Sequence, residues 1–258
     1  HGLGWRSDRR HCGVCAAMMR ILLTCALWLM PVSGWAAITH DATSTSAQTN
    51  VQNPSYTHTR GVSCANPIAV IKLTYQDSTP GTISSVTYGG TGATQVGSTQ
   101  DTTAAGNKEF VNLWRVVGVA SGGSTVQANF SEVMNDVQIS TSTYCGVHQG
   151  TPFGTAAGAS NVGNTTVTVN VSSAADEVVV DVAVISGTRT ITVGAGQNER
   201  TNVQSNHRHV ASDETGAATT TMSWTISSLQ SWAQVAAPLK PAAATTNCGG
   251  RMLMGVGC

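Results

Sequence analysis

Charged residues are scarce in this sequence and show no excess of one sign. Asp, Glu, Lys and Arg make up 10% of the 258 residues, and thirteen basic residues balance thirteen acidic ones. Beyond residue 36 the chain holds nine Lys and Arg against twelve Asp and Glu, a net charge of −3. Binding to a phosphate backbone requires clustered basic residues. The composition therefore predicts no nucleic-acid partner.

Motifs that carry enzyme chemistry are also missing. The chain has no G-x-S-x-G nucleophile elbow, no H-E-x-x-H helix, no P-loop and no dinucleotide fingerprint. The glycine-rich pieces GGTG and GAGQ follow predicted strands but open no helix, so neither offers a helix N-terminus to a phosphate group. We therefore expect a non-enzymatic protein with no catalytic residue, no cofactor and no metal.

Long apolar runs are limited to one segment near the start of the chain. Arg20 precedes the run Ile21–Val32 (ILLTCALWLMPV), and Gly34-Trp35-Ala36 places small residues at the −3 and −1 positions of a cleavage site. This pattern is typical of a secretory signal peptide, and the run is too short to span a bilayer. Residues 19–36 are therefore predicted to be a signal peptide and residues 1–18 an upstream non-native segment. The alternative is an N-terminal membrane anchor or a buried helix.

Cysteine is sparse in the remaining chain. Four cysteines lie beyond residue 36 and allow three pairings, between which the sequence alone does not choose. Cys64 precedes one predicted strand and Cys145 ends another, so a disulfide between these two residues is the favoured pairing. The alternative is a pair of buried free thiols.

Alternation of apolar and polar residues with a period of two is the strongest pattern that is present. It is clearest in Thr165–Ala195, where the alternate valines of Val178–Val184 fall on one face. β-branched residues at this spacing indicate a half-buried strand, because they lose side-chain freedom in a helix. Similar short runs, separated by Gly, Ser, Asn or Pro, recur along the chain. We therefore predict an all-β protein, an antiparallel β-sandwich of jelly-roll-like form with about 11–14 strands.

Composition divides the chain beyond the signal peptide into three parts. Residues 37–53 are polar and Thr-rich, and form either an edge strand or a flexible leader. Residues 54–241 form the predicted β-sandwich domain, and residues 242–258 a C-terminal tail. The polar N-terminal segment could add itself as a strand to the sheet edge of a neighbouring subunit. The predicted partner is therefore a second copy of the chain.

Several sequence pieces carry a resemblance when they are taken in order. These are VTYGG, FVNLWRVV, YCGVHQGTPFGTAA, DEVVVDVAV and TTTMSWTISSLQSWAQVAAPLKP. Over about Ile68–Pro241 the chain resembles a poorly characterised β-sandwich module that recurs in bacterial exported and envelope-associated proteins. The resemblance implies a jelly-roll-like sandwich and no established reaction. Cys145 departs from it, since the resemblance implies a non-cysteine residue there.

One tripeptide is the best candidate for binding a metal ion. His207-Arg208-His209 would place both imidazoles on one face of a strand, and Asp213 or Glu214 could add a carboxylate. However, Gln197–Gly216 holds the densest charge in the chain. We therefore interpret this segment as an exposed hairpin or loop with incidental histidines.

The carboxylates show no arrangement that predicts catalysis. Asp176-Glu177 and Asp213-Glu214 are adjacent pairs, and neighbours in a strand point to opposite faces, so neither pair converges for glycoside hydrolysis. Asp181 is expected on the outer face of its strand. Three further carboxylates at predicted turns could bind calcium, although no D-x-D-x-D-G loop is present: Asp77, Asp101 and Asp136.

Aromatic residues are few, at 5% of the chain. A sugar-stacking platform could form from five of them, although aromatics in strands more often belong to the core: Tyr88, Trp114, Tyr144, Trp224 and Trp232. Exposure of Trp224 and Trp232 would favour such a platform, and burial of both would remove its support.

The sequence therefore predicts a secreted or cell-envelope protein without a membrane span after signal cleavage. Its expected function is that of a non-enzymatic structural or adhesive subunit of the cell surface or of an extracellular assembly such as a filament. The first alternative is a carbohydrate-binding module, with a glycan as partner. The second is a glycoside or polysaccharide hydrolase domain, which would need two carboxylates roughly 5–10 Å apart in a cleft.

Overall fold

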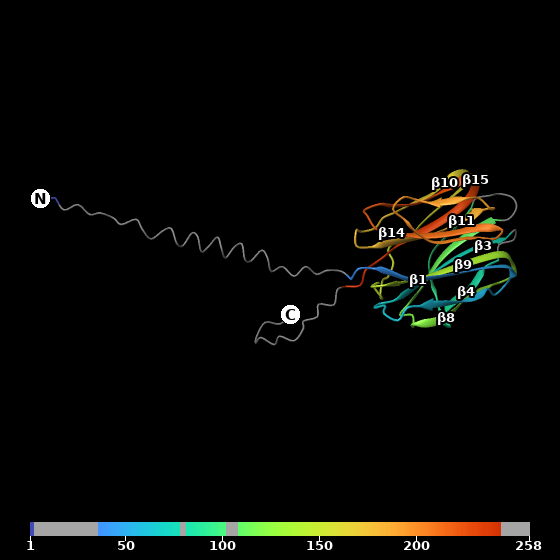
Figure 1. The fold of residues 1–258 in the computed structure, drawn as a ribbon, viewed down its shortest axis with the longest axis horizontal. Helices are drawn as coiled ribbons and strands as arrows, with labels where there is room; N and C mark the ends of the chain where they lie inside the picture. The colour runs from blue at the N-terminus through green and yellow to red at the C-terminus, as the bar shows by residue number, and fades with distance from the viewer. Residues whose placement is uncertain (3–35, 78–80, 102–107, 244–258) are drawn as a thin grey trace. The chain divides into compact units, whose positions relative to one another are not determined.

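The computed structural model describes residues 1–2, 36–77, 81–101 and 108–243 (Figure 1). The predicted upstream segment, nearly all of the predicted signal peptide and most of the predicted tail lie outside these residues. Within the described part, the regular elements are β-strands that pair antiparallel, and no helix is present. The prediction of an all-β antiparallel sandwich is confirmed. Fifteen strands are labelled in these residues, slightly more than the sequence suggested.

A five-stranded central sheet organises the fold. Its members, in spatial order, are β1 (Thr39–Val51), β9 (Met134–Cys145), β3 (Ile68–Asp77), β7 (Lys108–Val117) and β6 (Thr94–Gln100). β3 is buried along almost its whole length, because both faces of this sheet are covered. Its residues alternate between two hydrophobic clusters, with Leu73 in one and Val70 in the other. A near-continuous apolar run is what a strand buried on both faces requires.

The second sheet covers one face of the central sheet. It contains β2 (Ser55–Arg60), β8 (Gly122–Phe130), β4 (Ile83–Tyr88) and β5 (Thr91–Gly92), in that order. Ile71 and Leu73 of β3 share a core with Val126 and Phe130 of β8. The two-residue turn between β4 and β5 uses Gly89-Gly90, both at positive φ, which is the backbone a tight hairpin demands.

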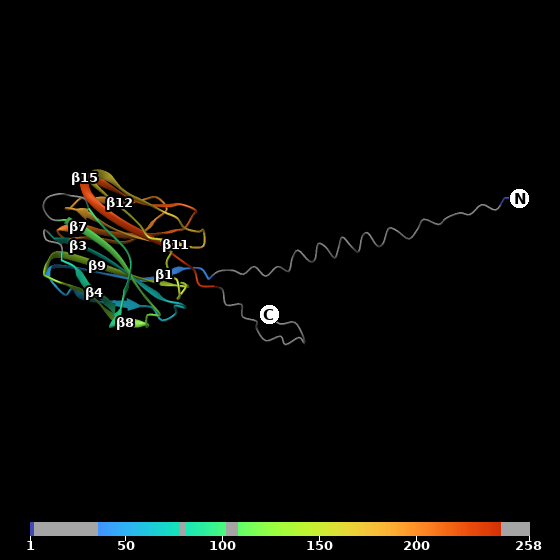
Figure 2. The same cartoon turned by 180° about the vertical axis from the view of Figure 1, so that it is seen from behind.

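The third sheet covers the opposite face of the central sheet. Its order is β10 (Ala157–Val171), β15 (Thr220–Leu239), β11 (Val178–Ser186), β14 (His207–Thr215) and β13 (Asn198–Gln204), and β12 (Ile191–Val193) pairs with β15. Val180 and Val182 of β11 pack with Val70 and Leu113 of the central sheet. Figure 2 shows β3, β7 and β9 between this sheet and the strands β4 and β8. The sandwich therefore consists of three stacked sheets.

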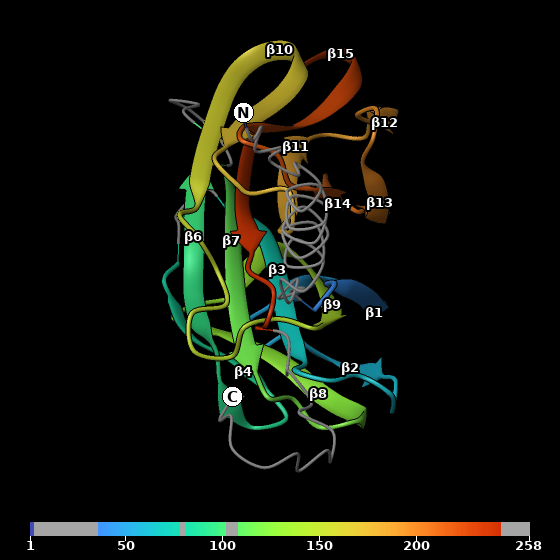
Figure 3. The same ribbon diagram turned by 90° about the vertical axis from the view of Figure 1, so that its left-hand side faces the viewer.

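The long strands β10 and β15 curve together over the outer face of the third sheet (Figure 3). Their register shifts between Asn161 and Thr166, where the pair bends. The first half of β15 then brings Trp224 against Ala183 and Ile185 of β11. This curvature buries the face of β11 that would otherwise meet solvent.

Candidate functional site

The strand β9 carries an uninterrupted run of hydroxyl side chains through the middle of the molecule. Ser140, Thr141, Ser142 and Thr143 have no exposed surface. Successive side chains in a strand point to opposite faces. The serines therefore face the third sheet, and the threonines face the second. Buried hydroxyl groups need hydrogen-bond partners, and this run finds them on both sides.

On the side of the second sheet, the threonines bind two aromatic side chains of β2. The hydroxyl group of Tyr56 donates to Thr141 Oγ1 over 2.6 Å, and His58 Nε2 lies 2.6 Å from Thr143 Oγ1 in a hydrogen bond. His58 Nδ1 forms a second bond, of 3.0 Å, to Ser44 Oγ of β1. Burial lowers the pKa of His58 to about 4, so this imidazole is neutral at neutral pH.

On the side of the third sheet lies a group of ionisable and hydroxyl side chains that we call the buried polar cluster. Its members are Lys72, Thr74, Glu109, Asp136, Gln138, Ser140, Ser142, His207 and His209. All nine side chains belong to residues with no exposed surface. They come from β3, β7 and β9 of the central sheet and from β14 of the third.

The centre of the buried polar cluster contains a hydroxyl–imidazole–carboxylate series. Thr74 Oγ1 lies 3.0 Å from His207 Nε2, and His207 Nδ1 lies 3.0 Å from Asp136 Oδ2. His209 bridges Thr74 and Ser140 through its two ring nitrogens, at 2.9 and 2.8 Å. These distances match those of a nucleophile, a base and an orienting carboxylate.

The two carboxylates of the buried polar cluster have opposite pKa shifts. Burial raises the pKa of Glu109 to about 7, against the opposing influence of the His207 imidazole 3.9 Å away. Burial also acts on Asp136, but His207 and the backbone N–H of Asn206 hold the pKa of Asp136 below its usual value. Asp136 is therefore the ionised carboxylate at neutral pH, and Glu109 is close to half-protonated.

Lys72 is the cation of the buried polar cluster. Its Nζ donates a hydrogen bond to Ser142 Oγ over 3.0 Å, and burial lowers the pKa of Lys72 to about 8, partly offset by Asp213 and Asp181. Nearby, Tyr144 donates to Asp213, which also forms a two-pronged ion pair with Arg200. Asp213 thus bonds to Arg200 of the third sheet and to Tyr144 of the central sheet rather than to the histidines.

The buried polar cluster offers no visible place for a substrate. A catalytic site requires a space about 3 Å from both the nucleophile and the oxyanion donors, with access for the reacting group. Here every member is fully buried, and each forms a hydrogen bond or ion pair with a side chain or a backbone group. Among the described residues, four of its atoms have no hydrogen-bond partner: Glu109 Oε2, Asp136 Oδ1, Gln138 Oε1 and His207 Nδ1. The series of Thr74, His207 and Asp136 therefore joins two sheets, and its geometry alone does not make it an active site.

The interpretation of Gln197–Gly216 as an exposed segment is wrong for its second half. β13 and β14 do form a hairpin, but β14 is buried and its two histidines point into the molecule. The expectation that His207 and His209 share a face is correct, since both bind Thr74. Within the described residues, no group of three or more His, Cys, Asp or Glu side chains is placed to hold a metal ion.

Asp181 was expected on an outer face and is instead fully buried. Its carboxylate accepts hydrogen bonds from the backbone N–H and the hydroxyl group of Ser212, the indole N–H of Trp224 and the amide of Gln234, over 2.6–2.8 Å. The curved half of β15 covers this carboxylate and supplies the Trp224 donor. The local alternation of β11 contains no signal of that cover.

The other predicted carboxylates lie apart. Glu177 caps its own turn by accepting from the backbone N–H of Ala174, over 2.8 Å. Asp77 accepts from the backbone N–H of Asn135, and Asp101 is buried at the end of β6. Neither joins Asp136 in a common site within the described residues.

The aromatic residues proposed for a sugar-stacking platform are mostly internal. Tyr88, Tyr144, Trp224 and Trp232 are buried, with at most 3% of their surface exposed. Trp114 differs, because it is only partly buried against the core beneath the second sheet. The pair Trp224 and Trp232 therefore cannot present a flat face to a ligand.

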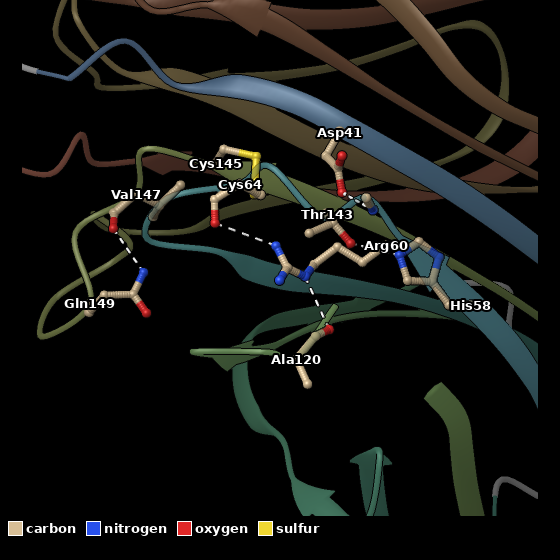
Figure 4. Close-up of a disulfide and its surroundings, with 10 residues drawn as sticks. Asp41, His58, Arg60, Cys64, Ala120, Thr143, Cys145, Val147 and Gln149 are labelled. Atoms are coloured by element: carbon tan, nitrogen blue, oxygen red, sulfur yellow. Dashed lines mark hydrogen bonds between the residues drawn. A yellow bond between two sulfur atoms is a disulfide. The ribbon is translucent and has the colours of Figure 1, made fainter. Parts of the chain in front are cut away.

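Cys64 and Cys145 form a disulfide at one end of the central sheet (Figure 4). The bond joins the segment before β3 to the end of β9, with the two Cα atoms 5.1 Å apart. Arg60 lies beside it and donates from Nε to the carbonyl of Ala120 over 3.0 Å. In the same region the carboxylate of Asp41 accepts from the backbone N–H of Gly61. The disulfide therefore lies at an end of the central sheet that hydrogen bonds from Arg60 and to Asp41 also hold together.

The segment predicted as a polar leader or edge strand is the edge strand β1. It pairs with β9 from Thr39 to Val51, with one irregularity near Asp41. The strand thus completes the sheet of its own chain. β2 of the second sheet contacts β1 through side chains, as in the bond between His58 and Ser44. No backbone ladder joins these two strands.

No helix in the described part of the chain is long and apolar enough to cross a membrane. No family model, curated protein or solved structure matches the chain, so its function must be argued from its own residues.

Proposed function

We propose that the protein is a secreted, non-enzymatic structural or adhesive subunit of a cell surface or extracellular assembly. The observation that carries this proposal is the closure of the buried polar cluster. Its side chains bind one another between two sheets and have no exposed surface. A group of this kind specifies how sheets stack, whereas a reactive centre needs access.

Hydrogen bonds on both faces of β9 support a structural function. Tyr56 and His58 connect the central sheet to the second sheet, and His207 and His209 connect it to the third. Because these bonds are directional, sliding one sheet over another would break several of them at once. The disulfide between Cys64 and Cys145 supports export, since such bonds persist in oxidising compartments.

The strand β1 is our candidate for contact with a second copy of the chain. It is thirteen residues long, and its section from Ala42 to Val51 contains no charged residue and no proline. Natural edge strands are usually protected by charge, proline or short length. A long uncharged edge favours addition of another strand, and the partner would pair with it by β-augmentation.

Three lysines on β1 test this proposal. Thr45, Ala47 and Thr49 have exposed side chains on alternate positions, and changing all three to Lys would set like charges on any paired edge. The matched control changes Thr221, Thr225 and Ser227 to Lys on the exposed face of β15, an interior strand of the third sheet. Light scattering and electron microscopy of the full chain should show assembly of the wild type and of the control, but not of the β1 variant.

Two outcomes would contradict self-association through β1. One is a wild-type chain that stays monomeric at every accessible concentration. The other is a β1 lysine variant that assembles like the wild type, or a control that fails equally.

Glycan binding is a second candidate function, favoured by a groove beside Trp114. The hydrolase alternative has no comparable support, because its best carboxylates, Glu109 and Asp136, are sealed from solvent.

A further inference from the structure

A groove lies on the central sheet where β6 and β7 run side by side (Figure 3). Its volume is about 410 Å³, within the range of small-molecule sites. Three aromatic and three amide side chains line it: Tyr75, Phe110 and Trp114, and Gln95, Gln100 and Asn112. The residues that enter β4 close its other wall.

The floor of the groove is aromatic. The rings of Tyr75 and Phe110 stack in parallel, with centroids 4.7 Å apart and an angle of 7° between their planes. Phe130 of β8 holds Tyr75 from the side, with ring centroids 5.0 Å apart. Both floor rings are mostly buried, so the core fixes their positions before any ligand arrives. Trp114 lies on the same face of β7 and is more exposed than either.

Three amide side chains surround this floor. Gln95 Nε2 donates to Asn112 Oδ1 over 2.9 Å, and the side chain of Asn112 also hydrogen-bonds the hydroxyl group of Tyr75. Asn112 is therefore held in place from two sides. The side chains of Gln95 and Gln100 are exposed and retain amide groups that can both donate and accept.

The lining is uncharged. None of the nine described residues that line the groove is acidic or basic. A second hollow of about 340 Å³ adjoins it, shares Tyr75, Gln100, Phe110 and Asn112, and adds the hydroxyl residues Ser98 and Thr99 of β6. The combined surface follows β6, which suits an extended ligand better than a compact one.

One polar atom of the residues that line the groove has no hydrogen-bond partner in the described part of the chain. Among the described residues, no acceptor binds the indole N–H of Trp114. A buried donor without a partner is costly, and an acceptor on a ligand that reaches it would satisfy it.

We propose that this groove binds a neutral oligosaccharide. A sugar ring has an apolar face of C–H groups, which fits the partly exposed surface of Trp114 above the buried pair Tyr75 and Phe110. Its rim carries hydroxyl groups that donate and accept, as the amides of Gln95 and Gln100 do. The absence of charge on the described lining disfavours acidic and basic ligands. This inference is independent of assembly through β1, because β1 and β6 are opposite edges of the central sheet.

The test is an array of neutral and anionic glycans probed with the full chain, followed by titration of the bound glycans. Trp114→Ala should weaken binding at least tenfold, and Trp114→Phe should retain part of it. The double variant Gln95→Ala with Gln100→Ala should weaken binding by a similar factor, because it removes both exposed amides and one of the two bonds that hold Asn112. Gln204→Ala, an exposed glutamine on β13, is the matched control and should bind like the wild type.

Circular dichroism of each variant separates lost binding from lost folding, and the double variant keeps the test valid if Trp114→Ala unfolds. Absence of any neutral glycan ligand would overturn the proposal. So would binding confined to anionic glycans, or binding that survives the double variant unchanged. Light scattering should show that the groove variants assemble like the wild type, so failure here is distinguishable from failure of the β1 proposal.

Discussion

The two faces of the central sheet are packed by different means. Toward the second sheet the contact is a large apolar core, including Ile71, Leu73 and Phe130, with a few neutral hydrogen bonds at its margin. Toward the third sheet an apolar cluster lies beside the buried polar cluster, which holds carboxylates, histidines and a lysine. The same strands, β3 and β9, supply both faces.

This difference separates stability from specificity. Apolar packing stabilises a sheet contact but tolerates changes in register if the total volume is kept. Charged groups in the interior gain little net stability, yet removal of one partner leaves the others unsatisfied. We infer that apolar packing stabilises both contacts, while the buried polar cluster also fixes which residues face each other toward the third sheet.

Removing the Asp136 carboxylate should have the largest effect. Asp136→Ala would leave His207 Nδ1 and the backbone N–H of Asn206 without their acceptor in the interior. The expected loss is about 3–5 kcal/mol of the free energy of unfolding, measured by chemical denaturation. Asp136→Asn keeps an oxygen acceptor and should lose clearly less. Equal losses for both variants would show that the carboxylate charge, and not its hydrogen bonds, stabilises this face.

Truncating an apolar side chain should cost about the same on either face. Leu73 faces the second sheet and Leu113 the third, and both are fully buried. Leu73→Ala and Leu113→Ala should each lose about 3 kcal/mol, from lost burial and the cavity left behind. Denaturation curves of the two variants measured side by side provide the comparison. A much smaller loss for Leu113→Ala would mean that the apolar packing also differs between the faces.

The sequence predicted the strands well and the layers poorly. The alternation in Val178–Val184 correctly indicated a strand, because side chains of a strand alternate between two faces and so give the sequence a period of two. The hydroxyl run of β9 and the charged run of β14 look like solvated surface, since polar residues usually are. They are buried because partners arrive from distant strands: Thr74 binds His207 across 133 residues. Such contacts leave no local pattern.

The candidate sites show the same limit. The sequence predicts Trp114 as one of five residues of a sugar-stacking platform, and the other four are buried. Its true neighbours, Tyr75 and Phe110, come from β3 and β7, and the exposed amides come from β6. The groove exists because the order of strands in the central sheet brings β3, β7 and β6 together. Strand order was not predictable from one sequence.

Replacing the buried lysine should have a small effect of opposite sign. Lys72→Met has a similar length and removes a charge that burial disfavours. Ser142 would keep its bond to Thr43, so no hydroxyl group is left without a partner. The free energy of unfolding at pH 7 should stay unchanged or rise by up to about 2 kcal/mol. A loss as large as that of Asp136→Ala would show that Lys72 forms an ion pair essential to this face.

The smallest effect is the pH dependence, whose contributions from Glu109 and His58 should differ in sign. Glu109 faces the third sheet, and burial raises its pKa to about 7 from 4.5. Between these values the folded chain binds the extra proton, so Glu109 stabilises at low pH and this contribution is lost as the pH rises. His58 faces the second sheet, and burial lowers its pKa to about 4 from 6.5. Here the unfolded chain binds the extra proton, so the contribution of His58 is lost as the pH falls.

Denaturation at pH 5, 5.5, 6 and 6.5 therefore distinguishes two variants. Glu109→Gln removes a contribution to the free energy of unfolding that decreases as the pH rises. The free energy of unfolding of this variant should therefore rise with pH more steeply than that of the wild type. His58→Gln removes a contribution that increases as the pH rises. The free energy of unfolding of this variant should therefore change less with pH than that of the wild type. Each change in slope has an upper limit of about 1.4 kcal/mol per pH unit. His40 and His209, whose pKa values burial also lowers, are present in both variants and cancel in the comparison. Parallel curves for the two variants would contradict the opposite pKa shifts of Glu109 and His58.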